Sequence, residues 1–174
     1  MINFKRVLFL SSLLLLCSCV GIPKGVKPVS NFELSRYLGT WYEIARLDHS
    51  FERGLSKVTA QYSLKEDGGV KVVNRGYSYD DEEWQEAEGK AAFVGQSDQG
   101  YLKVSFFGPF YGSYIVFELE HENYQYAFVS GPNLDYLWLL SRTSKVSPKV
   151  LDKFMAMSKS IGFDTDEIIL VEQD

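Results

Sequence analysis

The clearest structural signal in this 174-residue chain is residues 57–79, which read KVTAQYSLKEDGGVKVVNRGYSY. Apolar and polar residues alternate through the first half, with Val58, Ala60 and Tyr62 on one face. Alternation with a period of two is typical of a half-buried strand. Residues 67–69, Asp-Gly-Gly, favour a tight turn because glycine adopts positive φ without steric conflict. We therefore predict a hairpin of two antiparallel strands.

The same pattern extends over most of the chain, with turn signals every 8–14 residues between positions 41 and 142. The predicted strands are 41–47, 57–66, 70–79, 84–94, 102–106, 114–120, 124–130 and 136–141. Eight sequential antiparallel strands favour an all-β, up-and-down barrel, because closure removes the exposed sheet edges. A barrel of that size is either packed solid or holds one small ligand.

Helical signals flank the predicted barrel. Before it, Asn31 is a candidate cap for a short helical turn over residues 32–38. After it, Ser147 and Pro148 are typical of a helix start, and Gly162 of a helix end. One apolar stripe of this helix consists of Val150, Phe154, Met157 and Ile161. We expect the helix to pack outside the barrel and a short strand, 168–171, to follow it.

Composition excludes several classes of protein. The chain is 45% hydrophobic, 15% aromatic and 24% charged, which is ordinary for one soluble globular domain. Its net charge is −5 and it has no basic run, so we expect no nucleic-acid binding, which needs clustered Lys and Arg. The only cysteines are Cys17 and Cys19, so the residues after them can form no disulfide framework and no thiolate metal site.

Residues 1–18 are predicted to be a signal peptide. Lys5 and Arg6 precede the apolar run 7–16, which is shorter than the roughly 20 residues that span a bilayer. Residues 16–19, Leu-Cys-Ser-Cys, resemble the cleavage motif of bacterial lipoproteins. That resemblance implies attachment of diacylglycerol and an acyl chain such as palmitate at Cys19. An ordinary secretory signal with two incidental cysteines is the alternative.

The residues that follow Cys19 suggest a cellular location and a linker. Val20 stands where Asp often signals retention in the inner membrane, so we expect the outer membrane, with the domain facing the periplasm. Residues 19–30 contain two Pro and two Gly and are predicted to be a lipidated tether. Residues 31–174 then form the folded domain.

Two motifs resemble those of the lipocalin family. Gly39-Thr40-Trp41 resembles the family's Gly-x-Trp motif, and residues 137–142, LWLLSR, resemble its strand that ends in arginine. The resemblance implies that Arg142 crosses the Trp41 indole at the closed end of the barrel. Such a cation–π pair contributes about 0.5–2 kcal/mol. The family's second motif is degenerate here, at residues 119–124.

Further stretches are similar to bacterial outer-membrane lipocalins. These are residues 36–46, 51–55, 103–112 and 135–138. The similarity implies storage or transport of lipids, with a preference for lysophospholipids or fatty acids, in membrane maintenance under stress. It also implies a homodimer.

Period-two counting from Trp41 and Arg142 gives a candidate ligand-binding interior. The predicted lining is Val58, Ala60, Tyr62, Leu102, Val104, Phe106, Tyr114, Val116, Ala127, Val129, Trp138 and Leu140. Small residues, including Ala45, leave room for an acyl chain, and Tyr114 and Trp138 could donate hydrogen bonds to its head group. Glu43 and Glu118 also fall on the inner face by this count. Core packing is the alternative for each of these residues.

Catalytic and metal-binding motifs are missing from the sequence. His49 and His121 are the only histidines, and no nucleophile elbow, Walker loop or dinucleotide-binding glycine motif is present. We therefore expect no enzyme activity, no cofactor and no metal. The remaining alternative is a structural or partner-binding envelope lipoprotein with a filled barrel. The apolar stretch 106–111, FFGPFY, motivates it because such a loop at a barrel mouth can contact a membrane, a second subunit or a partner.

Overall fold

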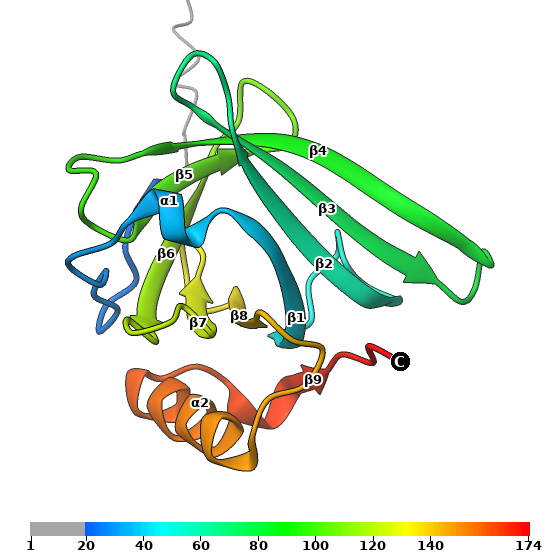
Figure 1. The fold of residues 1–174 in the computed structure, drawn as a ribbon. Coiled ribbons are helices and arrows are strands. Elements are labelled where there is room, and N and C mark those ends of the chain that lie inside the picture. The colour runs from blue at the N-terminus through cyan, green and yellow to red at the C-terminus, as the bar shows by residue number, and fades with distance from the viewer. Residues whose placement is uncertain (1–19) are drawn as a thin grey trace, which may run out of the picture.

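The computed structural model describes residues 20–174. The predicted signal peptide and Cys19 lie outside the described residues. Eight strands form one antiparallel meander, and the pairing of the first with the eighth closes it into a barrel (Figure 1). The strands are β1 (Gly39–Leu47), β2 (Leu55–Leu64), β3 (Val70–Ser78), β4 (Glu83–Phe93), β5 (Tyr101–Ser105), β6 (Gly112–Leu119), β7 (Tyr126–Ser130) and β8 (Leu137–Ser141). The predicted barrel is confirmed.

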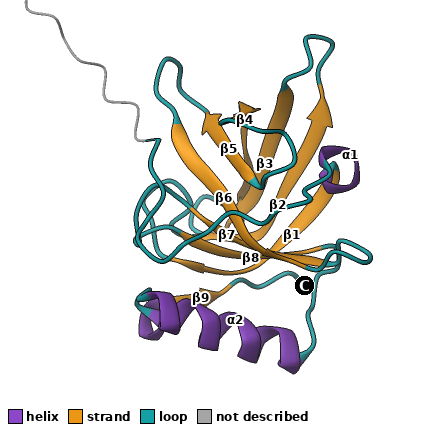
Figure 2. Cartoon of the chain, turned by 90° about the vertical axis from the view of Figure 1, so that its left-hand side faces the viewer, coloured by secondary structure: helices purple, strands orange, loops and turns teal. Residues whose placement is uncertain are grey.

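The C-terminal helix α2 (Pro148–Ile161) packs outside the barrel, also as predicted (Figure 2). Ser147 accepts a hydrogen bond from the Val150 N–H at 3.4 Å, and Gly162 ends the helix with φ 109°. All four residues of the apolar stripe belong to a cluster that joins α2 to the outer face of β1, β6, β7 and β8. A 3-10 turn η1 (Thr165–Glu167) and β9 (Ile168–Leu170) follow, and β9 pairs with the end of β1.

The N-terminal helix is shorter than predicted. Helix α1 (Leu34–Tyr37) has Glu33 at its N-cap position and no side-chain cap, so Asn31 does not cap it. Residues 20–30 also depart from the expected tether. Val26 is buried in the cluster under α2, and Val29 donates to the Val116 carbonyl at 2.9 Å. The Pro and Gly content reflects a segment that runs along the barrel wall without regular structure, where backbone hydrogen bonds and Val26 hold it.

Two β-bulges overturn part of the count of inward residues. The pairing of β1 with β8 shifts between Glu43 and Ala45, and that of β6 with β7 shifts between Val116 and Glu118. A bulge adds one residue to a strand and exchanges the faces beyond it. Ala45, predicted to face inward, therefore lies in the outer cluster. Glu118, also predicted inward, forms an ion pair with Lys153 of α2.

Candidate ligand-binding site

One apolar cluster lines the interior and receives side chains from all eight barrel strands. Its strand members are Trp41, Ala60, Tyr62, Val70, Val72, Ala91, Phe93, Leu102, Val104, Tyr114, Val116, Leu119, Ala127, Val129, Trp138 and Leu140. Together with Phe106, these include eleven of the twelve residues predicted to line the ligand site. The twelfth, Val58, is buried but lies outside the cluster, over the backbone of Gly76. The structure thus brings the predicted set together.

Part of this interior remains accessible. Val104, Phe106, Tyr114 and Trp138 belong to the cluster but are only partly buried. In contrast, Trp41, Val116, Ala127 and Val129 are 0% exposed. Apolar side chains that face inward and still meet solvent are typical of a cavity that opens to the outside. These four residues lie on β5, β6 and β8 and in the loop that follows β5.

The base of the barrel is sealed by Arg142. Its guanidinium carbon lies 3.9 Å from the centroid of the Trp41 ring, which confirms the predicted pair. The same guanidinium donates to the carbonyls of Arg36 at 2.7 Å, Thr40 at 2.9 Å and Tyr124 at 3.3 Å. These contacts join α1, the start of β1 and the β6–β7 turn. The degenerate second motif keeps this turn folded, because Glu120 accepts the backbone N–H groups of Glu122 and Asn123.

Three tyrosine hydroxyls meet inside the barrel. The Tyr114 hydroxyl shares hydrogen bonds with Tyr37 at 2.7 Å and with Tyr62 at 2.9 Å. Burial raises the pKa of all three phenols. Three hydroxyls carry three hydrogens and these two bonds use two of them, so one O–H remains able to donate. Tyr114, predicted to meet a ligand head group, therefore already has protein partners.

A buried polar cluster lies beside Trp138. Arg46 donates to Glu43 Oε1 at 2.8 Å and to the Glu52 carbonyl at 2.9 Å. The Trp138 indole N–H donates to Glu52 Oε2 at 3.1 Å, and His49 Nε2 lies 3.2 Å from the same oxygen. His49 and Glu52 come from the β1–β2 loop, which folds over this part of the barrel. The second predicted head-group donor, Trp138, is thus also engaged by the protein.

The pKa values of this cluster follow from its burial. Burial, and then the neighbouring Glu52 charge, raises the pKa of Glu43, while Arg46 opposes the shift. Burial also raises the pKa of Glu52. Burial and the Arg46 charge lower the pKa of His49 to about 4, so this imidazole is neutral at pH 7. Two carboxyl groups therefore share one buried cation, and removal of that cation leaves them uncompensated.

The sequence count missed most of this cluster. It placed Glu43 inward without a partner, and it did not place Arg46 on either face. The bulge after Glu43 brings Arg46 opposite Trp138 and turns it inward. The spacing of Glu43 and Arg46, three residues apart, gives no sign of such a pair in a strand.

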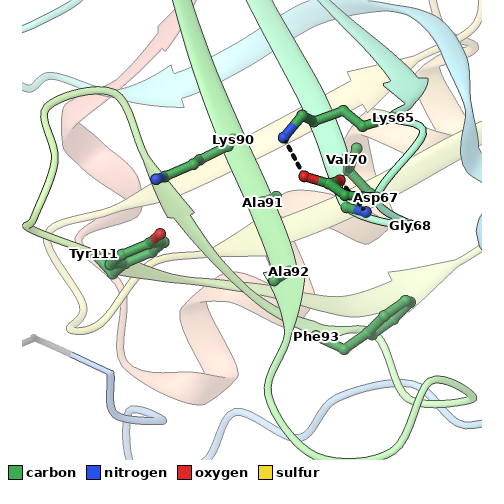
Figure 3. A pocket seen from close by; sticks show the side chains of 10 residues that line it. Lys65, Asp67, Gly68, Val70, Lys90, Ala91, Ala92, Phe93 and Tyr111 are labelled. Atoms are coloured by element: carbon green, nitrogen blue, oxygen red, sulfur yellow. Dashed lines mark hydrogen bonds and ion pairs between the residues drawn. The ribbon is translucent and has the colours of Figure 1, made fainter.

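A pocket of about 430 Å³ lies beside β4 and shares Val70, Ala91 and Phe93 with the interior cluster (Figure 3). It is lined by Lys65, Asp67, Gly68, Gly69, Val70, Lys90, Ala91, Ala92, Phe93 and Tyr111. On one side the Lys65 ammonium meets the Asp67 carboxylate at 2.7 Å, and on the other Lys90 lies over the Tyr111 ring. None of the twelve predicted ligand contacts lines it. The barrel interior, which unites those contacts, is therefore the candidate site.

Among residues 20–174, no group of three or more His, Cys, Asp or Glu is arranged to hold a metal ion. Within the same range, no helix has the length and apolar character needed to cross a membrane.

Comparisons with known proteins agree with this geometry. Residues 32–173 match the family described as Lipocalin-like domain. "Outer membrane lipoprotein Blc" of Vibrio cholerae serotype O1 is 67% identical over 165 residues, covering 92% of this chain and 96% of that protein. The protein of the same name from Escherichia coli K12 is 54% identical over 161 residues, covering 92% and 90%. Apolipoprotein D of Macaca fascicularis is 33% identical over 150 residues, covering 83% and 78%.

Solved structures show the same fold at lower sequence identity. Insecticyanin from the tobacco hornworm Manduca sexta has a TM-score of 0.69 with 22% identity, covering 87% of this chain and 86% of that one. A lobster apocrustacyanin C2 gives a TM-score of 0.64 with 20% identity, covering 88% and 93%.

Proposed function

Because this chain belongs to the lipocalin family, we propose that it is an outer-membrane lipoprotein, anchored through Cys19, that binds single-chain lipids in its barrel. The ligands are lysophospholipids or fatty acids, and the role is storage or transport of lipids in membrane maintenance under stress. The names of the relatives from Vibrio cholerae and Escherichia coli support the outer-membrane address.

The observation that carries this proposal is the interior cluster. An apolar face built from all eight strands, of which Val104, Phe106, Tyr114 and Trp138 stay partly exposed, suits an apolar tail that enters from outside. Small inward residues, Ala60, Ala91 and Ala127, leave width between the aromatic ones. Burial of an acyl chain contributes about 0.8 kcal/mol per CH₂ group.

The polar cluster favours a lysophospholipid over an ionised fatty acid. Among the described residues, Arg46 is the only buried Lys or Arg, and Glu43 and two carbonyls already occupy it. A fatty-acid carboxylate placed beside Glu52 would add like charge in a buried place, which is unfavourable. A phospholipid head group can instead stay at the solvent-accessible mouth while its tail lies inside.

A matched pair of substitutions tests ligand binding. Ala91 and Ala92 are neighbours on β4, but Ala91 is 6% exposed and faces the interior, whereas Ala92 is exposed. Ala91→Phe should abolish the 1:1 complex with lysophospholipid in native mass spectrometry, and Ala92→Phe should leave it unchanged. If the barrel takes up a lipid tail, the melting temperature of Ala91→Phe should stay close to that of the parent, because the added ring occupies the volume of the tail.

The alternative, a structural lipoprotein with a filled barrel, predicts the opposite. Overpacking of a filled interior would destabilise Ala91→Phe by about 1–3 kcal/mol, and the parent would take up no lipid. The same spectra, recorded at micromolar protein, also test the expected homodimer, which stays a prediction.

A further inference from the structure

The loop between β5 and β6 presents two uncovered phenylalanines. Phe107 is 79% exposed and Phe110 is 60% exposed, and Phe107 has the highest value among the large hydrophobic residues of the described chain. Side chains of this size are normally buried, because each removes a large apolar area from water. Two of them on one short loop therefore indicate a contact outside this chain.

The first described residues of the chain lie beside the same loop. The Gly21 N–H donates to Ser113 Oγ at 2.9 Å, and Ser113 Oγ donates back to the Gly21 carbonyl at 2.7 Å. Ser113 follows Phe110 by three residues, so at most about 11 Å of chain separates them. Cys19 precedes Gly21 by two residues, which adds at most about 7 Å. A lipid on Cys19 must therefore enter the membrane close to Phe107 and Phe110.

Positive charge adjoins the loop. The ammonium groups of Lys103 and Lys90 lie 5.0 Å and 5.7 Å from the centroid of the Tyr111 ring. Basic side chains near a membrane surface attract anionic lipid head groups. The acidic β3–β4 turn, residues 80–83, lies at the far right of Figure 1, away from β5 and β6. The charge next to the loop thus complements an anionic bilayer.

We infer that Phe107 and Phe110 insert into the bilayer that holds the lipid anchor and turn this part of the barrel mouth toward the membrane. This inference rests on the proposed anchoring at Cys19. Phe106, the adjacent residue, belongs to the interior cluster. A lipid tail can therefore pass from the bilayer along Phe107 and Phe106 into the barrel without crossing bulk water.

The test uses the full-length lipidated protein in vesicles of phosphatidylethanolamine and phosphatidylglycerol. An environment-sensitive dye is attached to Phe107→Cys or, as the control, to Glu122→Cys, an exposed position in the β6–β7 turn. The dye at 107 should shift to the blue and be quenched by bromine-labelled lipid tails, and the dye at 122 should do neither. An unshifted dye at 107 in vesicle-bound protein overturns the inference, and a blue shift without vesicles that grows with protein concentration assigns the loop to a second copy.

A functional measurement completes the test. The double variant Phe107→Ser/Phe110→Ser should transfer lysophospholipid from vesicles about tenfold more slowly or worse, because two apolar anchors are lost. Its affinity for dispersed lysophospholipid should not change. Unchanged transfer overturns the inference. Failure to float with vesicles, or to bind lipid at all, would instead contradict the proposed function.

Discussion

Arg46 donates a hydrogen bond to Glu43 at 2.8 Å inside the barrel, where both side chains are at most 4% exposed. The pair is positioned by the bulge in β1, and Arg46 also binds the carbonyls of Glu52 and Leu55, so it joins the strand to the β1–β2 loop. The cost of removing both charges from water offsets much of the attraction between them. Loss of one partner is nevertheless strongly destabilising, because the other charge stays buried without compensation.

We expect Arg46→Met to destabilise the protein by about 3–5 kcal/mol, because it leaves buried carboxyl groups without their cation. Urea unfolding at pH 7 measures this loss. The double variant Arg46→Met/Glu43→Gln should recover part of it. Arg53→Met, which breaks the exposed pair with Asp48, should change stability much less. An equally small effect of Arg46→Met would show that the carboxyl groups need no cation.

The pH dependence of stability should carry the signature of His49. Its pKa falls from 6.5 to about 4 on folding, so its contribution is fully present above pH 6.5 and is lost as the pH falls toward 4. At about 1.4 kcal/mol per unit of pKa, a fall of this size corresponds to a loss of about 3 kcal/mol. His49→Gln should flatten the melting temperature between pH 6.5 and pH 4, and His121→Gln, at an exposed position, should not. Identical slopes for the parent and His49→Gln would contradict the assignment.

Glu43 should make the protein less stable as the pH rises, the opposite of the effect of His49. Its pKa is raised from 4.5, so its contribution is present below pH 4.5 and is lost as the pH rises through the raised value. Glu43→Gln keeps an acceptor for Arg46 but cannot ionise. Its melting temperature relative to the parent should therefore increase as the pH rises above 4.5. A constant difference over that range would mean that Glu43 is ionised throughout.

The contribution of Arg142 to stability at the base of the barrel can be compared with that of Arg75, because both arginines lie over indole rings. Arg142→Met loses the Trp41 contact and three carbonyl partners, so we expect a loss of about 2–3 kcal/mol. Arg142→Lys should retain only part of this stability, because lysine lacks the planar guanidinium that reaches several carbonyls at once. Arg75, whose guanidinium lies 4.1 Å from the Trp84 ring on the outer face, is the control. Arg75→Met should cost about 0.5 kcal/mol, as exposed cation–π pairs do.

The sequence predicted the barrel, the outer helix and the Trp41–Arg142 pair because each depends on local periodicity or on a motif. The apolar interior was also largely predictable, since strands of unbroken alternation such as β7 keep one face inward throughout. The bulges in β1 and β6 were not predictable in this way. One inserted residue hardly changes composition or average hydropathy but exchanges faces, so Ala45 and Glu118 were placed on the wrong side.

The hydrogen-bond partners of the polar side chains in the interior could not be predicted from the sequence either. Glu52 and His49 come from the β1–β2 loop, whose path depends on tertiary contacts with Trp138 and Arg46 rather than on a local pattern. The tyrosine hydroxyls that meet at Tyr114 come from α1, β2 and β6. Such contacts join distant segments, and period-two counting gives the face of a residue but not its partner.

In Trp138 the aromatic ring and the indole N–H have different contacts, so substitutions can test them separately. The ring belongs to the interior cluster and lies 5.0 Å from the His49 ring, while the N–H is held by Glu52. We expect Trp138→Ala to weaken lysophospholipid binding more than about tenfold, or 1.4 kcal/mol, because it removes apolar contact with the tail. Trp138→Phe keeps most of that contact and should retain most of the affinity.

Titration of lipid into the protein, followed by native mass spectrometry, measures both variants. Trp84→Ala, on the exposed outer face of β4, is the control and should bind as the parent does. Trp138→Ala should also lower the melting temperature, because Glu52 loses a donor that stabilises its charged form. If Trp138→Phe lost as much affinity as Trp138→Ala, the indole N–H would contact the lipid head group directly, and Glu52 would have to release it when lipid binds.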